Sequence, residues 1–232
     1  MIARALHDAG VLRDAGFSAV IVENLGDAPF DPGPGEPHVI AHMAVVASMV
    51  RRVHGASLVV GINVLRNAPL AALGIASAVG ADFIRVNVHV GAMVTDQGLL
   101  EGRARDTLLY RRRLGLECAI AADVLVKHAA PLGGADIAQV AHDTFHRGGA
   151  DVLIVTGVAT GAEASPDRLQ AVRTAVPGAP LWLGSGLTPS NATRYRHLVD
   201  AAIVGTWLHH DGNLDAPLDP ERARAVVNAW NG

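Results

Sequence analysis

The sequence has little cysteine and little excess charge, and both scarcities exclude classes of protein. Its 232 residues include one cysteine, Cys118, which excludes an intramolecular disulfide and a zinc site built from several cysteines. The net charge is −3 with only 19 lysines and arginines, so the clustered positive charge of a nucleic-acid-binding surface is missing. We therefore expect no nucleic-acid partner.

Long apolar runs, leader-like segments and linkers are also missing. No stretch of about 18 apolar residues occurs, which excludes a transmembrane helix. The N-terminal stretch MIARALHDAGVLRDAG is amphipathic and carries two aspartates, unlike a signal peptide, so we expect a cytoplasmic protein. Half of the residues are hydrophobic, and no Pro/Ser-rich segment divides them. We expect a single domain over residues 1–232.

What the sequence does contain is a regular alternation of short apolar runs and helical stretches rich in Ala and Leu. This alternation predicts a parallel sheet, either a doubly wound layer or an eight-stranded βα barrel. No G-x-G-x-x-G motif follows the first run, which disfavours the doubly wound nucleotide-binding fold. The runs are AVIVEN (19–24), LVVGINVL (58–65), FIRVNV (83–88), CAIAADVLVK (118–127), DVLIVTG (151–157), LWLGSG (181–186) and AAIVGT (201–206).

The positions of the polar residues favour the barrel. They come late in the runs, and barrel enzymes collect their functional groups at the carboxyl ends of several strands. We therefore predict an α/β fold, a TIM-type (β/α)8 barrel. Only seven strands can be counted and the chain opens on a helix, so we expect the first strand to precede Met1 and the barrel to lack it here.

The run FIRVNVHVG (83–91) alternates apolar and polar residues, although the strands of a buried parallel sheet should be apolar on both faces. We expect Arg85, Asn87 and His89 to point into the barrel and to find partners on other strands, because unpaired buried polar groups are costly. Two interpretations remain open: a structural ion-pair cluster of Arg85 with Glu23 or Asp123, and a polar floor that faces a ligand.

The last two runs end in small residues, in the segments GSGLTPSN (184–191) and VGTWLHHDG (204–212). Loops after the seventh and eighth strands of a barrel commonly bind phosphate, because glycines let backbone N–H groups approach the anion. We expect Thr188 to cap the next helix, with Pro189 at its first position. The predicted phosphate-binding residues are Gly184, Ser185, Gly186, Asn191, Gly205 and Thr206.

Several segments together resemble the BtpA/SgcQ family, over about residues 2–225. The resemblance implies a βα barrel, associates photosynthetic members with photosystem I biogenesis, and places other members among sugar-metabolism genes; it supplies no defined reaction. The segments are VIVENLGDAPF (20–30), GINVLRNAPLAALGIASAVGADFIRVNVHVGAMVTDQGLLEG (61–102), ADVLVKHAAPLGG (122–134), VTGVATG (155–161) and GSGLTPSN (184–191).

The chain departs from the family pattern at two places. The family usually starts with a strand that carries a His and a Pro-rich loop, and this strand is absent. Its fifth-strand motif usually reads D-x-H-x-K-H, whereas here Leu125 stands between Asp123 and Lys127. Side chains two residues apart on a strand share a face, so we expect all three to point the same way. Both departures remove a candidate imidazole.

Residue chemistry suggests roles for the polar groups. Glu23 or Asp123 could act as general acid or base, and Lys127 could stabilise an oxyanion, form a Schiff base, or merely pair with Asp96 or Asp27. Asp27 could equally form a turn, and Asp96 could equally cap the following helix. The predicted catalytic residues are Glu23, Asp123 and Lys127, and the predicted substrate-binding residues are Asn24, Asp27, Asn63, Arg85, Asn87, Asp96, His128 and Thr156.

Metal chemistry is not indicated. His38/His42 and His142/His146 have helical ligand spacing but lack the glutamate of a metalloprotease motif, and we predict no metal and no cofactor. Two function classes remain. One is an enzyme of lyase, isomerase or hydrolase type that binds a phosphorylated sugar or nucleoside-like molecule. The other is a non-enzymatic photosystem I assembly or stability factor. A homo-oligomer is compatible with both.

Overall fold

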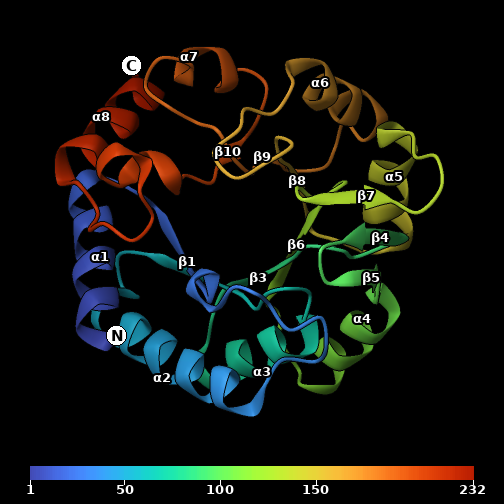
Figure 1. Cartoon of the computed structure of the whole chain (residues 1–232), viewed down its shortest axis with the longest axis horizontal. Coiled ribbons are helices and arrows are strands. Elements are labelled where there is room, and N and C mark those ends of the chain that lie inside the picture. The colour runs from blue at the N-terminus through green and yellow to red at the C-terminus, as the bar shows by residue number, and fades with distance from the viewer.

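Each predicted apolar run contains one strand of a parallel sheet that curls inside a ring of helices (Figure 1). The computed structural model describes residues 1–232. In spatial order the strands are β1 (Ala19–Glu23), β2 (Val59–Asn63), β3 (Phe83–Val86), β6 (Ala119–Asp123), β8 (Val152–Val155), β9 (Leu181–Leu183) and β10 (Ala201–Ala202). The helices are α1 (Ile2–Ala15), α2 (Pro37–His54), α3 (Pro69–Val79), α4 (Ala104–Arg113), α5 (Ile137–His142), α6 (Pro166–Ala175), α7 (Ala192–Tyr195) and α8 (Pro220–Asn231).

The sheet is open, whereas the helix ring is closed. The strands β1 and β10 are the two edges of the sheet, and no strand pairing joins them. Helix α1 nevertheless packs against α2 on one side and α8 on the other (Figure 1). The prediction of a barrel with seven strands is confirmed. None of the helices combines the length and the hydrophobicity that crossing a bilayer requires.

A second, antiparallel sheet, which the sequence analysis did not predict, follows the ends of β3 and β6. It consists of β4 (Ala92–Thr95), β5 (Gly98–Glu101) and β7 (Ala129–Pro131), with β4 in the middle. Asp96 lies in the turn between β4 and β5, and Arg103 precedes the first residue of α4. The alternative that Asp96 caps this helix is therefore wrong.

Inside the barrel, a layer of apolar side chains lies below the polar residues at the carboxyl ends of the strands. The rings of Phe83 and Trp182 meet edge to face with centroids 5.3 Å apart, and Ala121 and Ile154 complete this layer. Gly61 makes room for it, because a Cβ there would come within 2.2 Å of the Phe83 ring. Arg85 stands two residues after Phe83 on β3 and points the same way, so its side chain has to lie on this apolar layer. The main core, in contrast, lies between the sheet and the helices.

Three aspartates repeat one contact at the amino ends of the strands. Each directly precedes a strand, accepts a hydrogen bond from a backbone N–H of the neighbouring strand, and pairs with an arginine in the last turn of a helix. The contacts are Val60 N and Arg51 to Asp82 (2.8 and 2.9 Å), Ile120 N and Arg111 to Asp151 (2.8 and 2.6 Å), and Leu181 N and Arg173 to Asp200 (2.8 and 2.8 Å).

This contact makes a prediction for Asp200. Burial raises the pKa of this carboxyl, but the hydrogen bonds from Arg173 and the Leu181 N–H outweigh it and leave the pKa below 3.8. A depressed folded-state pKa means that the stabilisation is complete above 3.8 and is lost as the pH falls through the folded value. Asp200→Ala should lower the free energy of unfolding by about 1 kcal/mol at pH 7.

Urea unfolding of Asp200→Ala at pH 7 and pH 3 measures this effect. The difference from the wild type should shrink at the lower pH. The exposed Asp14, which pairs only with its neighbour Arg13, gives the control Asp14→Ala. A loss that is equal at both pH values would contradict the assignment.

Candidate functional site

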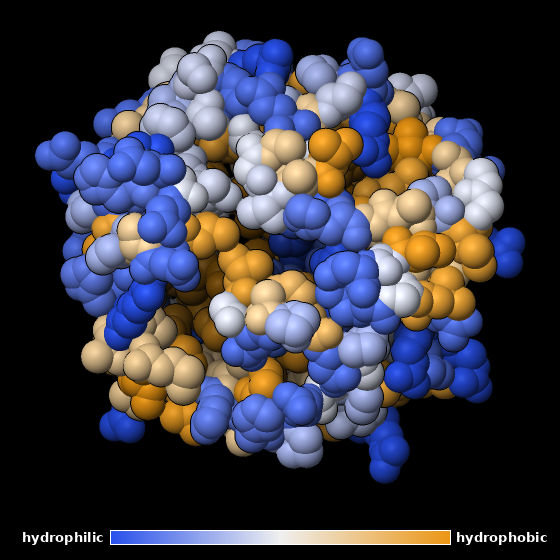
Figure 2. All heavy atoms as spheres, in the orientation of Figure 1, coloured by the Kyte–Doolittle hydropathy of each residue, from blue (hydrophilic) through white to orange (hydrophobic).

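The barrel holds two neighbouring cavities. The smaller lies at the carboxyl ends of the strands, and the larger extends along the gap at β1 as far as Ser18 and Val59 near the amino ends. The smaller has a volume of about 350 Å³, and the larger, between the edges β1 and β10, about 1000 Å³. Both are lined by Glu23, Arg85, Lys127 and Thr160, so they form one continuous site. Figure 2 shows this hollow near the centre of the face, blue at the centre and orange toward the side of α1.

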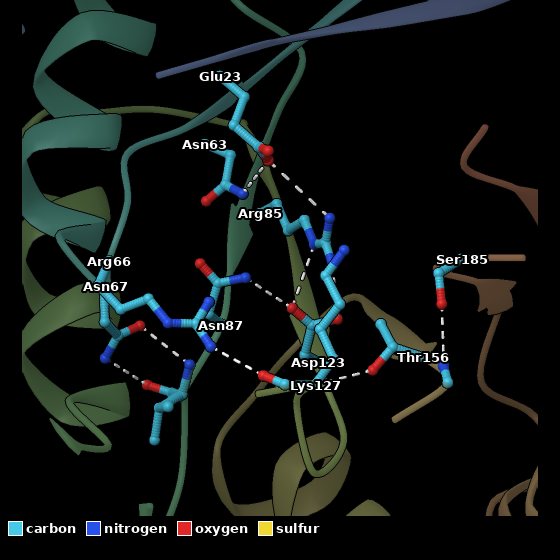
Figure 3. Close-up of polar contacts among 12 residues, drawn as sticks. Glu23, Asn63, Arg66, Asn67, Arg85, Asn87, Asp123, Lys127, Thr156 and Ser185 are labelled. Carbon is cyan, nitrogen blue, oxygen red and sulfur yellow. Dashed lines mark hydrogen bonds and ion pairs between the residues drawn. The ribbon is translucent and has the colours of Figure 1, made fainter. Parts of the chain in front are cut away.

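Arg85 forms the floor of the smaller cavity and is held by Asp123 (Figure 3). Its Nε and Nη2 donate to the two carboxylate oxygens of Asp123 at 3.1 and 3.0 Å, and Asn87 donates to the same carboxylate at 2.8 Å. The Asp123 side chain is 0% exposed and that of Arg85 is 6% exposed. Burial alone would lower the pKa of Arg85, but the charges of Asp123 and Glu23 raise it overall. The arginine is thus permanently charged.

Glu23 is the carboxylate that the ligand space can reach. Its side chain is 23% exposed at the end of β1. One oxygen, Oε2, accepts a hydrogen bond from Asn63 and lies 4.0 Å from Nη1 of Arg85. The other oxygen has no hydrogen-bond partner within the chain, so it is free to accept a proton or a ligand group (Figure 3).

Lys127 is a half-buried cation without a counter-ion. Its backbone is fixed, since its N–H donates to Thr156 Oγ1 at 3.1 Å. Its ammonium group forms neither a hydrogen bond nor an ion pair, so the alternative that it pairs with Asp96 or Asp27 is wrong. Burial lowers the pKa of Lys127, as does the nearby charge of Arg85, and Glu23 and Asp123 only partly offset these effects.

Two further residues of the smaller cavity, Arg66 and Thr160, were missed by the sequence analysis. Arg66 follows β2, and its guanidinium donates to the carbonyl oxygen of Lys127 at 2.8 Å. Thr160 follows β8, and its backbone N–H donates to Nε2 of His128 at 3.1 Å. Both residues stand beyond the apolar runs, which end at Leu65 and Gly157, so a rule confined to the late positions of the runs did not include them.

The expected alternation of inward and outward side chains does not continue beyond the ends of the strands. The prediction that His89 points into the barrel is wrong: β3 ends at Val86, and Nε2 of His89 lies 2.9 Å from the Gly148 carbonyl, next to the helix layer. The prediction that Leu125 shares a face with Asp123 and Lys127 is also wrong. Leu125 follows the end of β6 with a φ of 56°, and it packs against the apolar cluster of the small sheet.

The predicted phosphate loops line the larger cavity, but some of their side chains are already engaged. Ser185 accepts from the Gly157 N–H and donates to the Ala162 carbonyl, both at 2.9 Å. Asn191 accepts from the Thr188 N–H at 2.8 Å and directly precedes α7, so the prediction that Thr188 caps this helix is wrong. The predicted residues that line the larger cavity are Gly184, Ser185, Gly186, Gly205 and Thr206.

The other predicted residues divide between the cavity wall and its support. Asn24 accepts from the Leu65 N–H at 2.8 Å and donates to Asp27, so both lie in the loop after β1 rather than on the wall. No three His, Cys, Asp or Glu side chains approach one another closely enough to hold a metal ion. The predicted residues on the wall of the smaller cavity are Glu23, Asn63, Arg85, Asn87, Asp96, Lys127 and His128, whereas Asp123 and Thr156 lie behind it.

Several solved structures with similar folds carry a phosphate group in their names. Orotidine 5′-phosphate decarboxylase from Pyrococcus horikoshii superimposes with a TM-score of 0.64 at 16% identity, covering 100% of this chain and 95% of the other. Phosphoribosyl anthranilate isomerase from Thermus thermophilus gives 0.62 at 14% identity, covering 97% and 94%. At these identities the likeness establishes the fold, a TIM-type barrel.

Sequence relatives are much closer. Photosystem I biogenesis protein BtpA of Synechocystis sp. is 42% identical over 229 residues, which cover 99% of this chain and 79% of the relative. An uncharacterised protein of Thermococcus kodakarensis is 44% identical over 227 residues, covering 98% and 85%. A model of the BtpA family matches residues 1–232. Because the family model matches the whole chain and the relatives are this similar along nearly its whole length, the chain belongs to the BtpA family.

Proposed function

We propose that this protein is an enzyme that binds a phosphorylated sugar- or nucleoside-like molecule at the carboxyl end of its barrel. The observation that carries the proposal is the unpaired, desolvated ammonium of Lys127, which lines the same cavity as the partly free carboxylate of Glu23. A structural role would leave no reason to keep an unpaired, half-buried cation in a cavity. Burial of this kind is typical of groups whose proton affinity is tuned for chemistry.

The two groups suit proton transfer next to a carbonyl. Glu23 would take and return the proton as general base and acid, because its free oxygen can reach a ligand. Lys127 would stabilise the negative charge that develops on the carbonyl oxygen. Alternatively, its neutral amine would attack the carbonyl carbon and form a Schiff base, and the oxygen would leave as water. Such a step is shared by isomerases and lyases, and we favour these classes over hydrolysis.

The phosphate would bind at the β9 and β10 loops. Gly184, Gly186 and Gly205 line the larger cavity with little side chain to keep an anion away from their backbone N–H groups. Lys127 and Thr160 line both cavities, so one ligand could reach from these loops to the catalytic pair. The names of the structural neighbours, orotidine 5′-phosphate decarboxylase and phosphoribosyl anthranilate isomerase, are consistent with a phosphorylated ligand.

A non-enzymatic assembly or stability factor for photosystem I is the second candidate. It is favoured by the 42% identity with the Synechocystis protein that carries this name. A factor of this kind would have no need for a ligand, so ligand binding separates the two candidates.

The first experiment is a thermal melt with a panel of phosphorylated sugars and nucleotides, followed by solvent deuterium exchange into each ligand that binds. A ligand at 100 times its dissociation constant should raise the melting temperature by roughly 5–10 °C. Glu23→Gln should reduce deuterium exchange by at least about 100-fold while the melting shift persists. The exposed Glu117, which precedes β6, gives the control Glu117→Gln. A panel without any shift would refute the proposal in favour of the assembly factor.

Lys127→Met should abolish exchange and yet stabilise the fold at neutral pH. The lowered pKa means that the folded chain holds this proton less tightly than the unfolded chain, where the value is 10.5. The charged lysine therefore destabilises the fold at pH 7, and this penalty fades as the pH rises toward 10.5. We expect a gain of about 1 kcal/mol at pH 7, or about 2–4 °C. Melts at pH 7 and pH 10 measure it, and an unchanged or lower melting temperature at pH 7 speaks against a desolvated ammonium.

We assign Asp123 a positioning role in place of catalysis, because both of its oxygens accept hydrogen bonds from buried donors. Asp123→Asn leaves the buried Arg85 charge with only the more distant carboxylate of Glu23, 4.0 Å away, and should cost about 3 kcal/mol of unfolding free energy. The double variant Arg85→Met/Asp123→Leu should recover most of this loss. Denaturant unfolding of both variants tests the assignment, and a fully stable Asp123→Asn would exclude it.

A further inference from the structure

Arg66 is a buried cation of the smaller cavity that neither the proposed chemistry nor the pair of Arg85 with Asp123 uses. It follows β2, is 5% exposed and lines the cavity wall (Figure 3). A guanidinium group has five N–H donors. In this chain its only hydrogen-bond acceptor is the carbonyl oxygen of Lys127 at 2.8 Å, and it takes part in no ion pair.

The charges in and behind the cavity wall balance in number, but they are not all paired in space. The cavity is lined by three cations, Arg66, Arg85 and Lys127, and by two carboxylates, Glu23 and Asp96. Asp123 neutralises Arg85 from behind the wall. Arg66 and Lys127 are left as neighbours without counter-ions, joined through the Lys127 backbone. Burial lowers the pKa of both, which shows that their charged forms are desolvated. An anion in this cavity would satisfy both at once.

A buried acceptor lies in the same cavity. Asn87 lines the wall, and its side-chain nitrogen donates to Asp123, but its oxygen Oδ1 is buried and has no hydrogen-bond partner. An unpaired buried acceptor requires a donor, such as a ligand hydroxyl. A group that satisfies this end of the site therefore combines negative charge with a neighbouring hydroxyl.

This anion position is separate from the predicted phosphate loops. Arg66 lines only the smaller cavity, whereas Gly184, Gly186 and Gly205 line only the larger one. Lys127 lines both. A ligand with one phosphate at the glycine loops would thus place its opposite end at Arg66, with the Lys127 side chain between them.

We propose that Arg66 binds a second anionic group of the substrate, a carboxylate or a second phosphate, and so selects sugar-like ligands that are acidic at both ends. This inference rests on the proposed function, because it assumes a first phosphate at the glycine loops. Arg66 acts here as a specificity-determining residue, since its planar donor fork matches a carboxylate or phosphate.

Three six-carbon probes test it by calorimetric titration: glucose 6-phosphate with one anionic end, 6-phosphogluconate with an added carboxylate, and fructose 1,6-bisphosphate with a second phosphate. The wild type should bind at least one doubly anionic probe about 10- to 100-fold more tightly than glucose 6-phosphate. Which of the two gains affinity tells whether the second group is a carboxylate or a phosphate.

Arg66→Gln should reduce the ratio of affinities between the doubly anionic probe and glucose 6-phosphate to about one. Arg66→Lys keeps the charge and should retain part of the preference. The Lys variant also keeps the test decisive if the Gln variant folds poorly. Arg105, 83% exposed on α4 and paired only with Asp106, gives the control Arg105→Gln, which should retain the full preference.

The outcomes separate this inference from the proposed function. If glucose 6-phosphate binds and the doubly anionic probes bind no more tightly, the role of Arg66 is wrong and the phosphate site stands. A preference that survives in Arg66→Gln has the same meaning. If the wild type binds none of the three probes, the phosphate site is refuted and the second anion site with it.

Discussion

The site depends on one constraint, the neutralisation of Arg85 inside the barrel. Its side chain follows Phe83 on β3, so the guanidinium lies directly above an apolar layer and cannot be solvated from below. Asp123 on β6 satisfies it with two hydrogen bonds, and Asn87 holds the same carboxylate. The polar floor of the cavity is therefore a rigid, preorganised unit formed by neighbouring strands.

Openness of the sheet widens the site beyond this floor. Because β1 and β10 do not pair, the interior continues from the smaller cavity into the larger one, while α1 and α8 keep the helix ring intact on the outside. Glu23 ends the edge strand β1 and faces both cavities. The carboxylate best placed for chemistry thus belongs to the strand with the fewest neighbours, and Asn63 on β2 fixes one of its oxygens.

Periodicity in the sequence was sufficient to find the strands and much of the cavity wall, because both depend on local alternation and on strand ends. It failed where geometry is not periodic. His89 and Leu125 lie beyond the ends of their strands, and the positive φ of Leu125 turns the chain in a way that its side chain does not indicate. The small antiparallel sheet pairs β4 with β7, which are distant in sequence. The aspartate contacts at the strand starts, such as that of Asp151, also join distant residues.

Comparison of the three cations that line the smaller cavity separates structural charge from functional charge. Arg85, Arg66 and Lys127 line the same cavity, yet only Arg85 is neutralised by the chain itself. A fold selected for stability alone would have paired or replaced the other two, since an unpaired buried charge costs several kcal/mol, about the size of a whole domain's margin of stability. The chain instead fixes the Lys127 backbone through Thr156 and holds one guanidinium nitrogen of Arg66 on the Lys127 carbonyl, and it gives neither charge a carboxylate partner. Two cations that no carboxylate contacts, next to an arginine that the chain does neutralise, are therefore the strongest indication that this site binds an anion.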